Sequence, residues 1–62
     1  MLKPEELRMF RAARNMSQTA LGEKAGIPQW RVSLIERGVS PTRAEEKALA
    51  RVIAREVERG SR

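Results

Sequence analysis

Hydrophobic positions repeat at helical spacing in four segments of the 62-residue chain, and residues that begin or end helices stand between the segments. The first segment begins near Pro4, which suits a first turn because its missing N–H has no partner to lose there. Leu7, Phe10 and either Ala13 or Arg14 form its inward face, and the pattern predicts an end near Asn15. The sequence therefore predicts an all-α fold in a single domain over residues 1–62.

Residues 18–25 are predicted to form a second helix that ends in a tight turn. The hydroxyl of Ser17 can cap its first turn. Gly22 is costly inside a helix, so we expect another helix to cross closely at this position. Gly26 can supply the left-handed residue that ends the helix, so the chain turns within a few residues.

A third helix is predicted over residues 28–37, with Pro28 at its first position. Val32 and Ile35 are three positions apart and face back onto the second helix, and Gly38 ends the third. Two helices joined by so short a turn form a helix-turn-helix over residues 18–37.

The C-terminal helix is predicted over about residues 42–58. It begins either after Pro41 or with a capping box formed by Thr42 and Glu45, and the residues leave both starts open. Leu49, Val52, Ile53 and Val57 share one face of this helix.

A distinctive run of residues passes through the two central helices. It starts with a Ser-Gln pair, continues with a leucine, a small residue and the turn glycine, and ends with VSLIERG over residues 32–38. Together with Leu7, Phe10 and Arg11, this run resembles the phage-repressor and Cro-type (XRE-like) helix-turn-helix family over roughly residues 5–55. The resemblance implies a compact four-helix domain of the lambda-repressor-like type, here without a fifth helix. The central residues that carry it are Ser17, Gln18, Leu21, Gly22, Gly26 and Ile27.

The composition argues against catalysis. The chain has no cysteine and no histidine, and all 8 acidic residues are glutamates. Thiolate nucleophiles, imidazole bases and the commonest zinc ligands are therefore missing, and we expect no enzyme activity, no metal and no cofactor. No small-molecule ligand is evident either. Because no apolar run is long enough for a signal peptide or a membrane span, we expect a cytoplasmic, nucleoid-associated protein.

Positive charge is concentrated on the central motif. The net charge is +5 and the isoelectric point is about 11.1. Between Arg8 and Arg43, seven basic residues meet only Glu23 and Glu36, so this segment alone accounts for +5. Such a segment suits a polyanion, and double-stranded DNA is the expected partner.

The outward side of the third helix is expected to contact bases in the major groove. A glutamine can bond an adenine through two hydrogen bonds, and a serine can bond any base. The indole of Trp30 can pack on thymine methyl groups; the alternative is that Trp30 is a core aromatic. The predicted base-contacting residues are Gln29, Trp30, Ser33 and Leu34.

Phosphate contacts are expected from the ends of the helices that flank the groove, because arginine forks and helix N-termini both bind phosphate oxygens. The resemblance assigns one such contact to Gln18. The other predicted phosphate-contacting residues are Arg31, Arg37 and Arg43.

The resemblance also implies a partly buried salt bridge between Arg11 and Glu36, which assigns Arg11 to the scaffold and not to the DNA contacts. Arg8 and Arg14 are expected to face solvent.

The C-terminal helix offers two further surfaces. Basic residues stand at every fourth position, at 47, 51, 55 and 59. We favour a solvated face as their interpretation; a strip for a second phosphate backbone or an acidic partner is the other. A flank of small and apolar residues can join two copies of the chain or pack on the first helix. The predicted residues of the dimer interface are Ala50, Ala54 and Val57.

These observations predict a sequence-specific regulator of transcription that binds double-stranded DNA as a homodimer. The resemblance, with no ligand or activation domain in evidence, favours a repressor. The alternative is a helix-turn-helix used as a protein-interaction module, antitoxin-like or a scaffold subunit, whose basic surface meets an acidic partner. Outward-facing Trp30 and Leu34 support this alternative, because exposed aromatic residues also mark protein interfaces.

Overall fold

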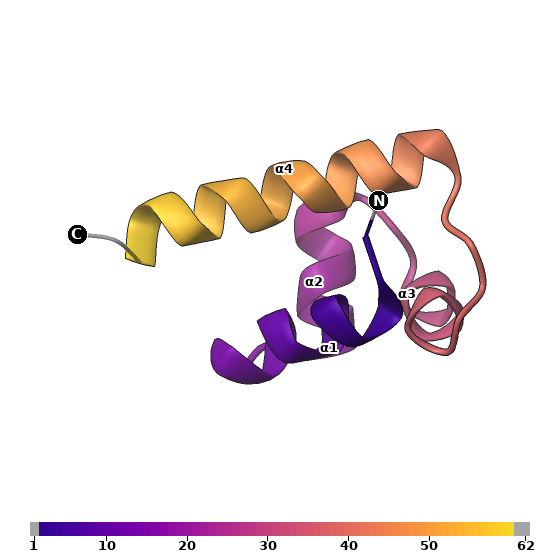
Figure 1. Ribbon diagram of the computed structural model, residues 1–62, viewed down its shortest axis with the longest axis horizontal. Helices are drawn as coiled ribbons and strands as arrows, with labels where there is room; N and C mark the ends of the chain where they lie inside the picture. The colour runs from indigo at the N-terminus through magenta and orange to yellow at the C-terminus, as the bar shows by residue number, and fades with distance from the viewer. Residues whose placement is uncertain (1, 61–62) are drawn as a thin grey trace.

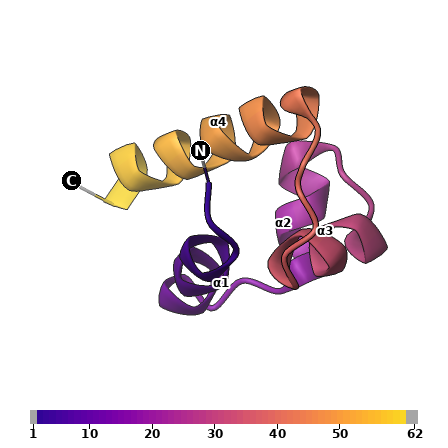
Figure 2. The ribbon, with the colours of Figure 1, turned by 45° about the vertical axis from the view of Figure 1, so that its right-hand side comes forward.

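The computed structural model describes residues 2–60 and contains four α-helices and no strand within them. They are α1 (Pro4–Ala13), α2 (Gln18–Ala25), α3 (Gln29–Glu36) and α4 (Arg43–Gly60). α4 extends along the length of the molecule, and α2 runs from α4 toward α1 (Figure 1). Turning the molecule shows α3 packed beside α2, with the connection from α3 to α4 crossing in front (Figure 2). The predicted all-α fold with a helix-turn-helix is confirmed.

The core draws one fully buried side chain from each helix: Leu7, Leu21, Val32 and Leu49. Ile27 in the turn, Ile35 on α3 and Val52 on α4 complete the buried set. Because no helix can bury its apolar face without the other three, α3 is held in place by the whole domain.

Capping residues account for the bounds of α2 and of the turn after it. The Ser17 hydroxyl accepts a hydrogen bond from the Ala20 N–H at 3.0 Å, as predicted for the cap. Gly26 has a φ of 72°, the left-handed conformation expected of it. At Gly22, a Cβ atom would stand 2.3 Å from the Ile27 carbonyl oxygen, so only glycine lets the turn pack this closely against the helix.

Several helix ends differ from the prediction by one or two residues. α1 ends at Ala13, before the predicted Asn15, and Asn15 instead adopts a left-handed φ of 55°. Pro28 caps α3 and is not its first residue: its φ of −61° would suit a helix, but its ψ of 149° is extended. The proline ring fixes φ and leaves ψ free, so this residue could serve either position.

The start of α4 is a capping box. The Glu45 N–H donates to the Thr42 hydroxyl at 3.1 Å, and the Thr42 N–H donates to the Glu45 carboxylate at 2.9 Å. Of the two starts that the sequence left open, the structure therefore has the one at Thr42, and the helix begins at Arg43.

Candidate nucleic-acid interface

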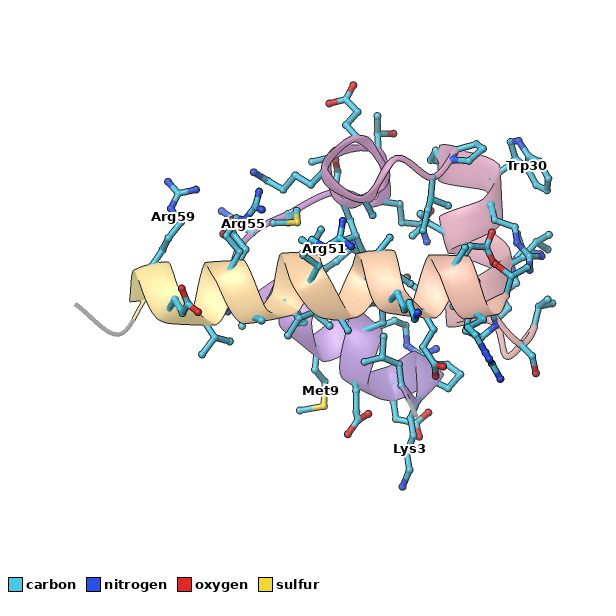
Figure 3. All side chains as sticks on the ribbon, turned by 90° about the horizontal axis from the view of Figure 1, so that it is seen from above. Lys3, Met9, Trp30, Arg51, Arg55 and Arg59 are labelled. Carbon is cyan, nitrogen blue, oxygen red and sulfur yellow. The ribbon has the colours of Figure 1, made fainter. Side chains whose placement is uncertain are left out.

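The outward side of α3 is accessible and slightly hollowed. Gln29 and Trp30 are exposed, Ser33 and Leu34 are half-buried, and together with Arg37 they line a hollow of about 300 Å³. Trp30 has 61% of its surface exposed and projects from one end of the molecule (Figure 3), so the alternative of a core aromatic is wrong. The structure thus brings the four predicted base-contacting residues together on one face, and their contact with DNA stays a prediction.

A chain of hydrogen bonds joins this face to the interior. The Gln29 side-chain amide donates to the Gln18 carboxamide oxygen at 2.7 Å. The Gln18 amide nitrogen in turn donates to the carboxylate of Glu36 at 3.0 Å. The side chain at the start of α2 therefore orients the first side chain of α3, a coupling that sequence reasoning did not anticipate.

Glu36 is the one buried charged residue among those described, with 3% of its surface exposed. Its carboxylate receives the Arg11 guanidinium through Nε at 2.5 Å and Nη2 at 2.9 Å, so the pair that the resemblance implies is present. Burial raises the pKa of Glu36, but the hydrogen bonds from Arg11 and Gln18 outweigh it and hold the pKa below its usual range. Arg11 also donates to the Met16 carbonyl at 2.9 Å.

Arg31, predicted to contact phosphate, is committed to an internal ion pair. Its Nε lies 2.7 Å from the Glu45 carboxylate, and its Nη2 donates to the Ser40 carbonyl at 3.2 Å. The hydrogen bond from Arg31 lowers the pKa of Glu45. Because Glu45 also caps α4, Arg31 ties α3 to the start of the last helix. The sequence predicted the capping box, but it did not predict that Arg31 would bond Glu45.

Arg37 and Arg43 stand on either side of the connection between α3 and α4, and both are exposed. The Arg37 guanidinium donates to the Ser33 hydroxyl on α3 at 3.1 Å. No ion pair involves either guanidinium within residues 2–60, so both can reach a phosphate oxygen without breaking a bridge of the fold.

Arg14, expected to face solvent, instead links α1 to α4. It is half-buried, its guanidinium carbon lies 4.8 Å from the centre of the Phe10 ring, and its Nη2 donates to the Glu56 carbonyl at 3.1 Å. Arg8 is exposed as expected, although it donates to the Glu36 carbonyl. No signal in the sequence identified the hydrogen bonds from these arginines to Glu36 and Glu56, because they join residues at least 28 positions apart.

The predicted dimer flank of α4 is open. Ala50 and Ala54 are exposed, and Val57 has 52% of its surface exposed. The exposure of Ala50 and Ala54 argues against packing of the flank on α1, the alternative considered for it. Whether it joins two copies stays a prediction.

None of the helices within the described part of the chain is long and apolar enough to cross a membrane.

Two short helices crossing at a glycine turn, with the second presenting an open polar face, define a helix-turn-helix protein of the DNA-binding class. The helix-turn-helix family model matches residues 7–60, and the chain belongs to this family of DNA-binding transcription regulators. Comparison with curated proteins and with solved structures found no match.

Proposed function

We propose that this protein represses transcription by binding a specific duplex as a homodimer, with α3 in the major groove. One observation carries the proposal: Gln29, Trp30, Ser33, Leu34 and Arg37 line a single open hollow on the outward side of α3. A face of this kind can meet base edges while the core residues of α3 keep its opposite side on the domain.

Base recognition is proposed to centre on Gln29. Its amide nitrogen is held by Gln18, and its carboxamide oxygen accepts no hydrogen bond within residues 2–60. That oxygen can accept from adenine N6 or cytosine N4, both of which point into the major groove. Ser33 offers a second polar group, and Trp30 an apolar surface for a thymine methyl group.

Phosphate contacts are proposed for Arg37, Arg43 and Gln18. The two arginines form no ion pair within residues 2–60, and the Gln18 amide has a second hydrogen that Glu36 does not use. Because that amide lies at the first residue of α2, the positive end of the helix dipole adds to its attraction for phosphate. We leave Arg31 out of this set, because its guanidinium already bonds Glu45 and Ser40.

Dimerisation is proposed through the open flank of α4. One recognition helix covers only a few base pairs, and a single small module seldom competes against the many other sites in a genome. Two copies related by a two-fold axis overcome this when their recognition helices lie roughly 34 Å apart, one turn of DNA. The small side chains of Ala50 and Ala54 allow two helices to approach closely, and Val57 supplies apolar area.

Selection of bound duplexes from a random pool, followed by salt titration on the enriched site, tests the proposal. We expect a palindromic motif with half-sites about one turn apart, and affinity that falls as salt rises. A duplex of the same composition with the motif scrambled is the matched control, and it should bind about a thousandfold more weakly. Recovery of no enriched motif would contradict sequence-specific binding.

A further inference from the structure

Four basic residues of α4 form what we call the basic ridge: Lys47, Arg51, Arg55 and Arg59, each four positions from the next. Lys47, Arg51 and Arg55 are exposed and form no ion pair within residues 2–60, whereas Arg59 lies 3.5 Å from the Glu56 carboxylate. The ridge therefore presents unneutralised positive charge along most of the helix.

The charge pattern of the ridge differs from that of a helix face that contacts only solvent. Such faces pair glutamates with basic residues three or four positions away. The positions three and four away from Lys47 and from Arg51 hold only alanine, lysine and arginine. Like charges at this spacing destabilise the helix slightly, so an acidic ligand lying along the ridge relieves a repulsion that solvent leaves in place.

The C-terminal half of the ridge lies away from the outward side of α3. Arg51, Arg55 and Arg59 lie along one side of α4 and reach its C-terminal end, whereas Trp30 lies at the opposite end of the molecule (Figure 3), which is 33 Å long. The N-terminal end of the ridge adjoins Arg43, four positions before Lys47, so Arg55 and Arg59 are the ridge residues farthest along the helix from that proposed phosphate contact. The ridge borders the dimer flank, because Ala50 is three positions from Lys47 and Ala54 is three positions from Arg51; Val57 lies well away from Arg59 around the helix axis.

A hollow between α2 and α4 lies beside the C-terminal half of the ridge. It has a volume of about 180 Å³ and is lined by Lys24, Val52, Arg55, Glu56 and Arg59. Glu56 already lies near three cations, at 3.9 Å from Arg14, 3.8 Å from Lys24 and 3.5 Å from Arg59. Positive charge therefore dominates the rim, and Val52 adds an apolar contact at the base.

We propose that the basic ridge binds an acidic helical segment of a partner protein. The ridge advances about 6 Å per basic residue, four residues of helical rise, and a helix with a glutamate at every fourth position has the same repeat. A duplex fits less well, because Glu56 and Glu58 stand among the cations and repel a continuous phosphate backbone. Discrete carboxylates can instead align with the basic residues alone.

The probe is a synthetic peptide of about 20 residues with glutamate at every fourth position and alanine elsewhere, long enough to form a helix. Its binding to the full chain is measured by calorimetry beside an isomeric peptide whose glutamates are consecutive. We expect the spaced peptide to bind more tightly. Replacing both Arg51 and Arg55 with glutamine should weaken its binding about fivefold to tenfold.

The matched control removes two positive charges elsewhere, through Lys3→Gln with Arg37→Gln. It should change peptide binding by less than about twofold, because neither residue belongs to the ridge and single exposed charges contribute little to binding. Equal losses in the two double variants, or equal binding of the two peptides, would overturn the proposal. Circular dichroism confirms that each variant is folded.

Duplex binding by the ridge variant separates this proposal from the proposed function. Unchanged affinity for the selected site supports two independent surfaces. A loss of duplex affinity as large as the loss of peptide affinity would mean that the ridge contacts phosphates, and would overturn the acidic-partner proposal alone. Failure of the unaltered protein to bind any duplex would contradict the proposed function and leave the peptide result standing.

Discussion

Removing the Glu36 carboxylate most directly tests how the buried ion pair with Arg11 supports the outward side of α3. Glu36→Ala leaves the Arg11 guanidinium with only its bond to the Met16 carbonyl, and leaves the Gln18 amide without its acceptor. Breaking a buried ion pair by deleting one partner costs about 3–5 kcal/mol, because the remaining charge is uncompensated. Arg11 retains 20% side-chain exposure, so water recovers part of this cost and we expect a loss near 3 kcal/mol.

A domain of 62 residues has little stability to lose, since small cores rarely supply more than about 3–5 kcal/mol. Glu36→Ala should therefore be largely unfolded near 37 °C, and Glu36→Gln, which keeps a hydrogen-bond acceptor, should be affected less. Circular dichroism melts and urea titrations measure both. Glu23→Ala is the matched control, because Glu23 is exposed and has no ion pair within residues 2–60; its stability should change by less than about 0.5 kcal/mol.

The same carboxylate predicts a pH dependence. The pKa of Glu36 is lowered below its ordinary 4.5 in the folded state, so its contribution is present above that value and is lost as pH falls through the folded pKa. Stability should therefore decrease on acidification below about pH 5, and less steeply in Glu36→Gln. Wild-type-like melting of Glu36→Ala, or the same acid dependence in Glu36→Gln, would refute the reasoning.

Four further predictions follow from the site and the fold. Gln29→Ala should reduce discrimination at one or two base pairs by roughly 1–3 kcal/mol, whereas Arg43→Ala should weaken all duplexes alike and flatten the salt slope by about one unit; matched and mismatched duplexes distinguish these effects. Arg31→Gln should lower the melting temperature and leave the salt slope unchanged, and a flatter slope would return Arg31 to the phosphate contacts. Gly22→Ala should destabilise the domain by about 1–3 kcal/mol despite its better helix propensity, because the added Cβ meets backbone; a stabilised variant in chemical denaturation would disprove the close crossing. Val57→Glu should abolish the dimer in sedimentation while helicity is retained, and a protein that stays monomeric on a palindromic site would exclude the α4 interface.

Local signals in the sequence accounted for most of the fold. The hydroxyl cap of Ser17, the left-handed Gly26 and the Thr42 capping box each depend on residues within a few positions, and each is present. Pro28 was placed one residue too far into α3, because a fixed φ suits both the cap and the first turn. Local chemistry therefore predicted the elements well and their exact ends less well.

The candidate site was less accessible to sequence reasoning, and the arginines show why. Arg14 and Arg31 look like any exposed basic residue in a helical pattern, yet each meets a glutamate on a different helix. Such partners are set by how the helices cross, which periodicity does not specify. Only Arg11 was paired with its partner from the sequence, and there a family resemblance supplied the pairing.

These ion pairs show that only part of the positive charge on the motif is available to bind DNA. Four of its seven basic residues, Arg11, Arg14, Lys24 and Arg31, make ion pairs that join helices, so they support the fold and are not available for phosphate without loosening it. The uncommitted charge lies in two places: beside the connection from α3 to α4, at Arg37 and Arg43, and along the basic ridge of α4. Arg43 stands one turn before Lys47 on α4, so the two places adjoin at the start of this helix, whereas Arg59 lies at the end of the molecule away from Trp30 (Figure 3). The net charge of +5 therefore supports a second electrostatic contact at that far end, beside the proposed DNA contact.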